Sequence, residues 1–198
     1  VSHPELREQV VLNMYHARFG YELDQGLTLP QIRGKEGVRV RTAYAHASRT
    51  YGVAWQGRRY DRTKWNRADP INRALSAANA LLNGLCHAAI ISGGYSPGLG
   101  FIHTGRQLSF VYDIADLYKV DLTIPIAFKT IAESSRDVEG RVRQACRERF
   151  REEKLLERLL PDIDRLLNIE TLPYEEFEDA DAAGSPPGPL WEFLEEEV

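Results

Sequence analysis

The sequence predicts a mainly α-helical fold, a bundle around one buried central helix followed by an extended acidic tail rich in proline. Residues 69–92 would be apolar on nearly every face of a helix, which is typical of a helix surrounded by others. Residues that favour helix starts and stops bracket several further segments. No segment shows the apolar–polar alternation of a half-buried strand.

The N-terminal segments have recognisable helix ends. A first helix is expected over residues 2–20, with Ser2 as its cap and Pro4 in its first turn. A second helix is expected from about Pro30 to Tyr51, and residues 52–68 form an irregular basic loop. These two helices would precede the central one.

The central helix has the clearest start signal, because Asp69 is a good capping residue and Pro70 suits the first helical position. Gly93 and Gly94 end it, and a loop rich in turn residues follows. Further helices are expected over residues 107–118, 125–134 and 138–167, the last one broken near Pro161.

Charge divides the chain into two parts, a helical domain over residues 1–168 and a tail over residues 169–198. Residues 170–198 hold ten acidic residues and no lysine or arginine, so the net charge of −4 hides a basic domain. The tail also contains the linker-like run GSPPGP. Its anchors for a partner would be its large apolar side chains, Tyr174, Phe177, Trp191, Phe193 and Leu194. A disordered solubilising tail is the alternative.

Bulk composition excludes several classes of protein. With 43% hydrophobic and 27% charged residues, the chain is expected to be soluble and globular. Polar residues interrupt the apolar stretch over residues 74–91, which argues against a membrane span. The two cysteines, Cys86 and Cys146, belong to no C-x-x-C pair, which argues against zinc and against a disulfide framework. Because the sequence begins without methionine, we expect that it starts inside a longer protein.

A basic stretch runs from Arg33 to Arg73, with eleven basic and three acidic residues. Five aromatic residues, two of them tryptophans, are interleaved with the arginines. Guanidinium groups suit phosphates and aromatic faces suit unpaired bases, so the stretch predicts binding of nucleic acid. An ordinary solvated face is the alternative.

The run GFIHTGRQLSFVYDIAD contains the strongest candidate site. Asp113 and Asp116 lie three residues apart in an otherwise apolar helix, so they share one face, and His103 precedes that helix in a loop. Buried carboxylates need a partner, and two carboxylates with an imidazole suit a divalent ion. Oxygen ligands favour Mg²⁺, and the imidazole shifts the preference toward Mn²⁺. The alternative is that His103 completes a turn and the aspartates face solvent.

Glu36 is a second unusual feature, because it lies between Gly34 and Gly37 inside a segment that otherwise predicts a helix. Each interior glycine costs about 1 kcal/mol relative to alanine, which makes sense where a ligand or another backbone must approach closely. Basic residues flank Glu36 on both sides. A kinked helix with an exposed glutamate is the alternative.

Three motifs together resemble one known family. RGKEG, the run from Gly57 to Ile90 (GRRYDRTKWNRADPINRALSAANALLNGLCHAAI) and the run from Gly94 to Lys119 (GYSPGLGFIHTGRQLSFVYDIADLYK) resemble the CRISPR-associated adaptation integrase Cas1, of the subtype I-E kind. The resemblance covers about residues 2–167. It implies the C-terminal helical catalytic domain of the family, without the N-terminal β-sandwich-like domain.

The resemblance also implies site residues. The family's metal ligands correspond to Glu36, His103 and Asp116, with Asp113 as a further catalytic residue in a supporting role. Positions matching residues that grip DNA or read its single-stranded end are Arg33, Arg58, Arg59, Tyr60, Trp65, Arg106 and Tyr112. For Tyr60 and Trp65 a packing role is the alternative.

The implied activity is that of a DNA integrase and endonuclease dependent on Mg²⁺ or Mn²⁺, which joins the 3′-hydroxyl of a short spacer-precursor DNA to a CRISPR repeat by transesterification. The implied partners are double-stranded DNA with single-stranded 3′ ends, CRISPR repeat DNA, a second copy in a homodimer, and the bridging subunit Cas2, on which the tail would dock. The implied location is the prokaryotic cytoplasm. Two alternatives are a non-catalytic helical DNA-binding scaffold and a nuclease that cuts branched DNA without joining it.

Overall fold

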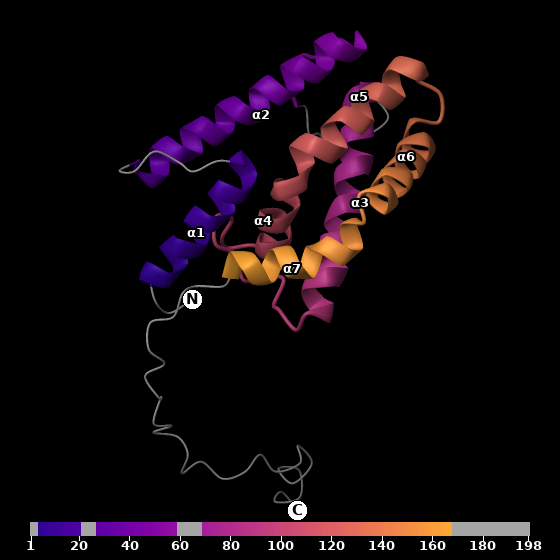
Figure 1. The fold of residues 1–198 in the computed structure, drawn as a ribbon. Helices are drawn as coiled ribbons and strands as arrows, with labels where there is room; N and C mark the ends of the chain where they lie inside the picture. Colours follow the sequence, from indigo (N-terminus) through magenta and orange to yellow (C-terminus); the bar gives the residue numbers. More distant parts are fainter. Residues whose placement is uncertain (1–3, 21–26, 59–68, 168–198) are drawn as a thin grey trace, which may run out of the picture.

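The computed structural model describes residues 4–20, 27–58 and 69–167, and within these ranges it is helical and contains no strand. The mainly α fold class is therefore confirmed. Figure 1 shows the elements, which in chain order are α1 (Pro4–Phe19), α2 (Leu29–Tyr51), α3 (Pro70–Ser92), α4 (Ser109–Tyr118), the π-helical segment η2 (Lys119–Thr123), α5 (Ile124–Glu133), α6 (Val138–Glu152) and α7 (Leu155–Leu167).

The central helix α3 begins where its sequence predicts. The Asp69 side chain caps it by accepting a hydrogen bond from the Asn72 amide at 2.8 Å. The helix then packs against α4, η2, α5, α6 and α7 (Figure 1). Leu75, Leu82 and Ile90 are completely buried by these neighbours, so α3 is the core of the bundle, as predicted.

Among the described helices, α3 alone has the length and composition that would allow a membrane crossing. A helix at the centre of a bundle has the same composition, and its five packed neighbours give α3 that environment. Its Cys86 and the α6 residue Cys146 are both free and buried, and burial raises the pKa of each thiol to about 12.

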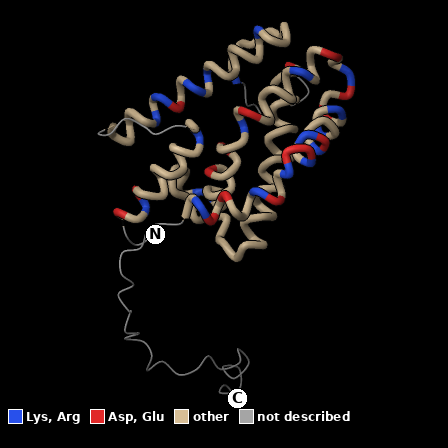
Figure 2. The backbone as a smooth tube through the Cα atoms, in the orientation of Figure 1, with Lys and Arg blue, Asp and Glu red and all other residues tan. Residues whose placement is uncertain are grey.

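The second helix, α2, lies on the outside of the bundle. Within it only Ile32 and Ala47 are buried, and its main neighbour is α5. Five of its residues are lysine or arginine and one, Glu36, is acidic (Figure 2). α2 therefore presents an exposed basic surface beside the rest of the bundle.

The break predicted near Pro161 lies elsewhere, which is a correction. α6 ends at Glu152, Lys154 adopts a left-handed conformation with φ 49°, and α7 continues through Pro161. A proline inside a helix costs about 3 kcal/mol through its missing amide and its ring. Packing overrides that cost here, because Leu155, Leu159 and Ile163 form a fully buried face of α7.

The two helices predicted over residues 107–118 and 125–134 are joined without a gap through η2. In this wide turn the Ile124 amide bonds to the Lys119 carbonyl, five residues earlier. The Thr123 hydroxyl donates to Asn79 of α3 at 2.8 Å and ties the turn to the core. This continuous element carries the aspartates of the candidate site.

Candidate functional site

The buried carboxylate of Asp113 organises the loop that precedes α4. Its Oδ2 accepts hydrogen bonds from the amides of Phe101 at 2.8 Å and Ile102 at 3.1 Å, and its Oδ1 accepts one from the His103 amide at 2.9 Å. The Asp113 side chain has no exposed surface. It therefore does not lie on a solvated face, and that alternative is wrong for this residue.

The same carboxylate fixes the ring of His103. Nδ1 of His103 lies 2.7 Å from Asp113 Oδ1, so the imidazole is held by one nitrogen and its other nitrogen, Nε2, remains available. Nε2 lies 3.8 Å from Oδ2 of Asp116, one helical turn beyond Asp113. Carboxylate-held imidazoles of this kind are typical of histidines that bind metals, because the hydrogen bond sets the ring orientation.

Gly100 allows the loop to close. A Cβ atom at this position would lie 1.7 Å from the His103 carbonyl oxygen and 2.4 Å from Cβ of Ser109. Both neighbours belong to the backbone of the loop or to the first residue of α4, so neither can move aside. Only glycine fits, and the hydrogen bonds from the loop to Asp113 depend on it.

Glu36 reaches the same region from α2. Its Oε1 lies 4.0 Å from Nη1 of Arg18, and Oδ2 of Asp116 lies 3.8 Å from the same nitrogen. Glu36 also accepts a hydrogen bond from Arg39 Nε at 2.9 Å, and Asp116 accepts one from Lys119 Nζ. The structure thus brings Glu36 and Asp116 to the same nitrogen of one buried guanidinium.

A hollow of about 270 Å³ lies between these elements. Glu36 and Asp116 line it from α2 and α4, together with Lys119, Arg58 and Asn79. A second hollow of about 520 Å³ lies away from the site, between α3, α6 and α7, and is lined mainly by apolar side chains such as Leu81, Leu85 and Phe150. The smaller of these two hollows is lined by two of the three carboxylates that the sequence predicted, Glu36 and Asp116.

The donor set suits Mg²⁺ or Mn²⁺ by its chemistry, two carboxylates and an imidazole. His103 Nε2 and Asp116 Oδ2 are 3.8 Å apart. Glu36 is 4.0 Å from Nη1 of Arg18, and within the described residues no three acidic, cysteine or histidine side chains converge closely enough to hold an ion. The metal site therefore stays a prediction.

The predicted DNA-binding residues fall into three groups. Arg33 and Arg106 are exposed, on α2 and in the loop before α4. Tyr112 is half-buried with its ring edge-on to His103 at 6.0 Å, and Arg58 bonds to Asn72 and Ser76 of α3 while it lines the smaller hollow. Arg59, Tyr60 and Trp65 lie outside the described residues, as do the tail anchors Tyr174, Phe177, Trp191, Phe193 and Leu194.

Three cations at the site were not predicted. Arg39 and Lys119 each follow a site carboxylate by three residues, a spacing that the sequence already showed. Arg18 is less obvious, because it lies in α1, far along the chain from the site. Its only signal is that it continues the buried positions Val11 and Tyr15 at helical spacing, so that a charge falls on an apolar stripe.

Fold and site together define a helical bundle that places acidic side chains and a carboxylate-held imidazole beside a basic helix. The model of the family described as "CRISPR associated protein Cas1" matches residues 13–154. The chain belongs to this family, which confirms the resemblance seen in its sequence.

Individual relatives agree. The CRISPR-associated endonuclease Cas1 2 of Thermus thermophilus is 56% identical over 195 residues, which cover 98% of this chain and 59% of the relative. The CRISPR-associated endonuclease Cas1 of Escherichia coli K12 is 45% identical over 163 residues, which cover 82% of this chain and 53% of the relative. This chain thus spans somewhat more than half the length of these curated relatives.

Solved structures of the same family also resemble this chain. The crystal structure described as a TtCas1–DNA complex matches with a TM-score of 0.79 and 57% identity, over 84% of this chain and 62% of that chain. The structure described as TtCas1 matches with a TM-score of 0.78 and 54% identity, over 87% of this chain and 64% of that chain. Both likenesses support the mainly helical fold.

Proposed function

We propose that this chain is the catalytic domain of a metal-dependent DNA integrase and endonuclease of CRISPR adaptation. The observation that carries the proposal is the arrangement around Asp113: its carboxylate holds His103 so that Nε2 faces Asp116, beside the hollow that Glu36 also lines. Relatives named as CRISPR-associated endonucleases and a relative solved with DNA support it.

The reaction is a transesterification. The 3′-hydroxyl of a short DNA attacks the phosphorus atom at the 5′ end of a CRISPR repeat strand, and a new oxygen–phosphorus bond forms. The bond to the 3′-oxygen of the nucleotide that precedes the repeat breaks, and that oxygen takes up the proton lost by the attacking hydroxyl. Glu36, His103 and Asp116 would hold Mg²⁺ or Mn²⁺. When bound, the ion polarises the phosphate and neutralises the charge that develops on it.

The residues around the ligands position them and the DNA. Asp113 orients the His103 ring, and the backbone amides that bond to Asp113 keep it in place. Arg33 and Arg106, both exposed, would contact phosphates of the duplex, and Tyr112 offers a ring beside His103. Arg58, Arg59, Tyr60 and Trp65 complete the proposed DNA surface.

We also propose the assembly in which this domain works. Its partners are DNA with single-stranded 3′ ends, CRISPR repeat DNA, a second copy of the chain, and the Cas2 subunit, on which the acidic tail docks. The compartment is the prokaryotic cytoplasm. Deleting residues 170–198 should remove Cas2 binding in a measurement of complex mass, and a complex of unchanged mass would contradict the docking role.

A joining assay tests the activity. A labelled DNA fragment is incubated with supercoiled plasmid carrying a repeat, with Cas2, in Mg²⁺, Mn²⁺ or EDTA. We expect joining only with a divalent ion, and we expect Asp116→Ala to abolish it while duplex affinity stays within about a few-fold, because phosphate contacts dominate that affinity.

Each other outcome favours a different function. Joining by Asp116→Ala in Mn²⁺ would contradict the site. Cutting without joining would favour the branched-DNA nuclease. DNA binding that persists in EDTA, with no reaction under any condition, would favour the non-catalytic scaffold.

A further inference from the structure

Arg18 is the most unusual charged residue of the described chain. Its side chain is 2% exposed, and its Nη1 lies 4.0 Å from Glu36 Oε1 and 3.8 Å from Asp116 Oδ2. Both distances are too long for a hydrogen bond. Its Nε is buried and has no hydrogen-bond partner within the described residues. A buried guanidinium with an unsatisfied nitrogen lowers the stability of the folded state, so its presence needs an explanation other than packing.

Arg18 is held where it is. Its Nη2 donates to the Asp113 carbonyl oxygen at 3.0 Å, and its guanidinium lies 5.6 Å from the centre of the Tyr15 ring. By contrast, Arg39 and Lys119 are partly exposed, so they can turn toward solvent or a phosphate. Of these three cations, Arg18 is therefore the one that burial and a backbone hydrogen bond hold in place.

Cations already match the carboxylates of the site without an ion. Glu36 and Asp116 lie beside Arg18, Arg39 and Lys119, and Arg58 lines the same hollow. The third carboxylate, Asp113, is held by backbone amides and by His103. A divalent ion entering this cluster would leave it with an excess of positive charge. Phosphates of DNA supply the negative charge that restores the balance.

We propose that Arg18 is a positioning residue that couples the ion to the DNA, an inference that rests on the metal site of the proposed function. It keeps Glu36 and Asp116 facing one point. Its fixed positive charge repels a divalent ion, so the site binds the ion weakly in the absence of DNA. A DNA phosphate that enters the hollow offsets this repulsion, so the ion and the DNA bind cooperatively.

The test measures Mn²⁺ binding, by the electron paramagnetic resonance signal of free Mn²⁺, to the 198-residue chain with and without a short duplex carrying 3′ overhangs. For the natural chain we expect the duplex to tighten Mn²⁺ binding by about tenfold or more. Arg18→Met should tighten Mn²⁺ binding without DNA by a similar factor and lose most of the effect of the duplex.

Two further variants separate charge from packing. Arg18→Lys keeps the positive charge and should keep weak Mn²⁺ binding without DNA. Arg149→Met is the matched control, because Arg149 of α6 lies 2.6 Å from Glu153 and has no ion pair with a site carboxylate, so the variant should bind Mn²⁺ as the natural chain does.

Failure of the inference is distinct from failure of the proposed function. If Asp116→Ala abolishes Mn²⁺ binding but Arg18→Met leaves it unchanged, the inference about Arg18 is overturned and the metal site survives. If the natural chain binds no Mn²⁺ with or without DNA, the metal site itself is overturned.

If Arg18→Met loses its helical circular dichroism, Lys119→Met replaces it. Lys119 donates to Asp116 from a partly exposed position, so its removal should also tighten Mn²⁺ binding without DNA. Unchanged binding in that variant would overturn the charge balance on which the inference depends.

Discussion

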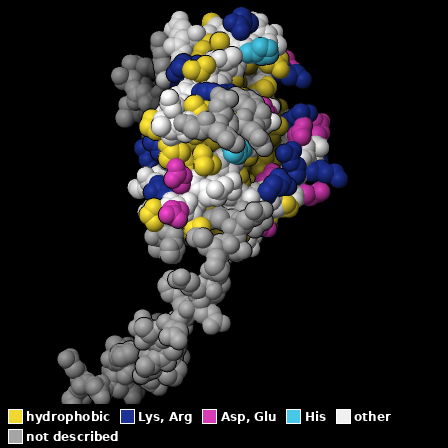
Figure 3. Space-filling view, turned by 60° about the vertical axis from the view of Figure 1, so that its left-hand side comes forward, with side chains coloured by type: hydrophobic (Ala, Val, Ile, Leu, Met, Phe, Trp, Pro, Cys, Tyr) yellow, Lys and Arg dark blue, Asp and Glu magenta, His cyan; other side chains and the backbone are white. Residues whose placement is uncertain are grey.

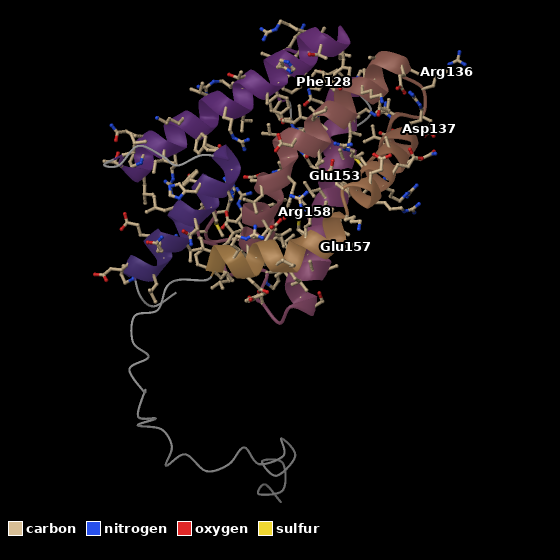
Figure 4. All side chains as sticks on the ribbon, viewed as in Figure 1. Phe128, Arg136, Asp137, Glu153, Glu157 and Arg158 are labelled. Atoms are coloured by element: carbon tan, nitrogen blue, oxygen red, sulfur yellow. The ribbon has the colours of Figure 1, made fainter. Side chains whose placement is uncertain are left out.

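Two regions of the molecule place carboxylates beside arginines, and they do so in opposite ways. On the face formed by α6 and α7 the two shortest pairs have exposed arginines: Arg149 lies 2.6 Å from Glu153, and Arg165, whose side chain is 75% exposed, lies 2.9 Å from Asp162. Figure 4 shows Glu153 and Arg158 at the junction of these helices, and Figure 3 shows basic and acidic side chains intermingled on the surface.

At the candidate site the carboxylates are buried or nearly so, and the shared cation, Arg18, stands 3.8 Å and 4.0 Å from two of them. Exposed pairs contribute at most about 1 kcal/mol each, because water screens them and the side chains lose freedom. Glu36 and Asp116 also have short pairs, with Arg39 at 2.9 Å and with Lys119, but in addition they share the buried Arg18. A buried cation shared by two carboxylates, rather than the number of ion pairs, distinguishes this site from the surface.

The largest contrast is expected between Asp113→Asn and Asp162→Asn. At Asp113 an amide nitrogen would face backbone N–H donors, which should lower the free energy of unfolding by about 1–3 kcal/mol and weaken Mn²⁺ binding about 10–100-fold. At Asp162, which accepts bonds from the Tyr118 hydroxyl and Arg165, the loss should stay below about 1 kcal/mol with Mn²⁺ binding unchanged. Urea unfolding measures the free energy of unfolding of each variant, and titration measures its Mn²⁺ affinity. Equal losses in Asp113→Asn and Asp162→Asn would contradict the expected difference between the two regions.

A smaller contrast concerns DNA. Arg106→Ala removes an exposed guanidinium from the loop that carries His103, so duplex affinity should fall several-fold and the slope of log affinity against log salt should decrease by about 1. Arg165→Ala removes an equally exposed guanidinium from the other face, where Asp162 already pairs with it, and should change neither quantity. Fluorescence anisotropy at several salt concentrations gives both slopes, and identical slopes would place the duplex elsewhere.

The smallest effect is expected at the glycines of two helices. A Cβ at Gly34 of α2 or at Gly84 of α3 would meet nothing within 4 Å, so alanine should raise the free energy of unfolding by about 0.5–1 kcal/mol in both. Only Gly34→Ala should also lower duplex affinity, by a few-fold, because Gly84 lies at the apolar hollow between α3, α6 and α7. If Gly34→Ala gains stability and binds DNA normally, close approach of a ligand is not the reason for that glycine.

Local signals in the sequence predicted much of the fold and the shared helical face of two candidate acids. Asp69 and Pro70 predicted the start of α3, and the spacing of Asp113 and Asp116 predicted that both lie on one face of α4. These features depend on residues a few positions apart, which is the range over which helix geometry alone decides contacts.

What the sequence did not reveal depends on contacts between distant segments. Packing of α7 carries the helix through Pro161, so the local rule for proline failed there. Arg18 reaches Glu36 and Asp116 only because α1 packs against α4, and no spacing along the chain encodes that meeting. Burial of a charge is decided by tertiary structure.

Substitutions at Gly100 would affect the site without changing any of its polar residues. Gly100 has no side chain, and this leaves room for the His103 carbonyl. Any substitution at this position would therefore displace the loop that carries His103, although no charged residue of the site would be changed. A gene altered at Gly100 would still encode all of the acids of the site and its histidine.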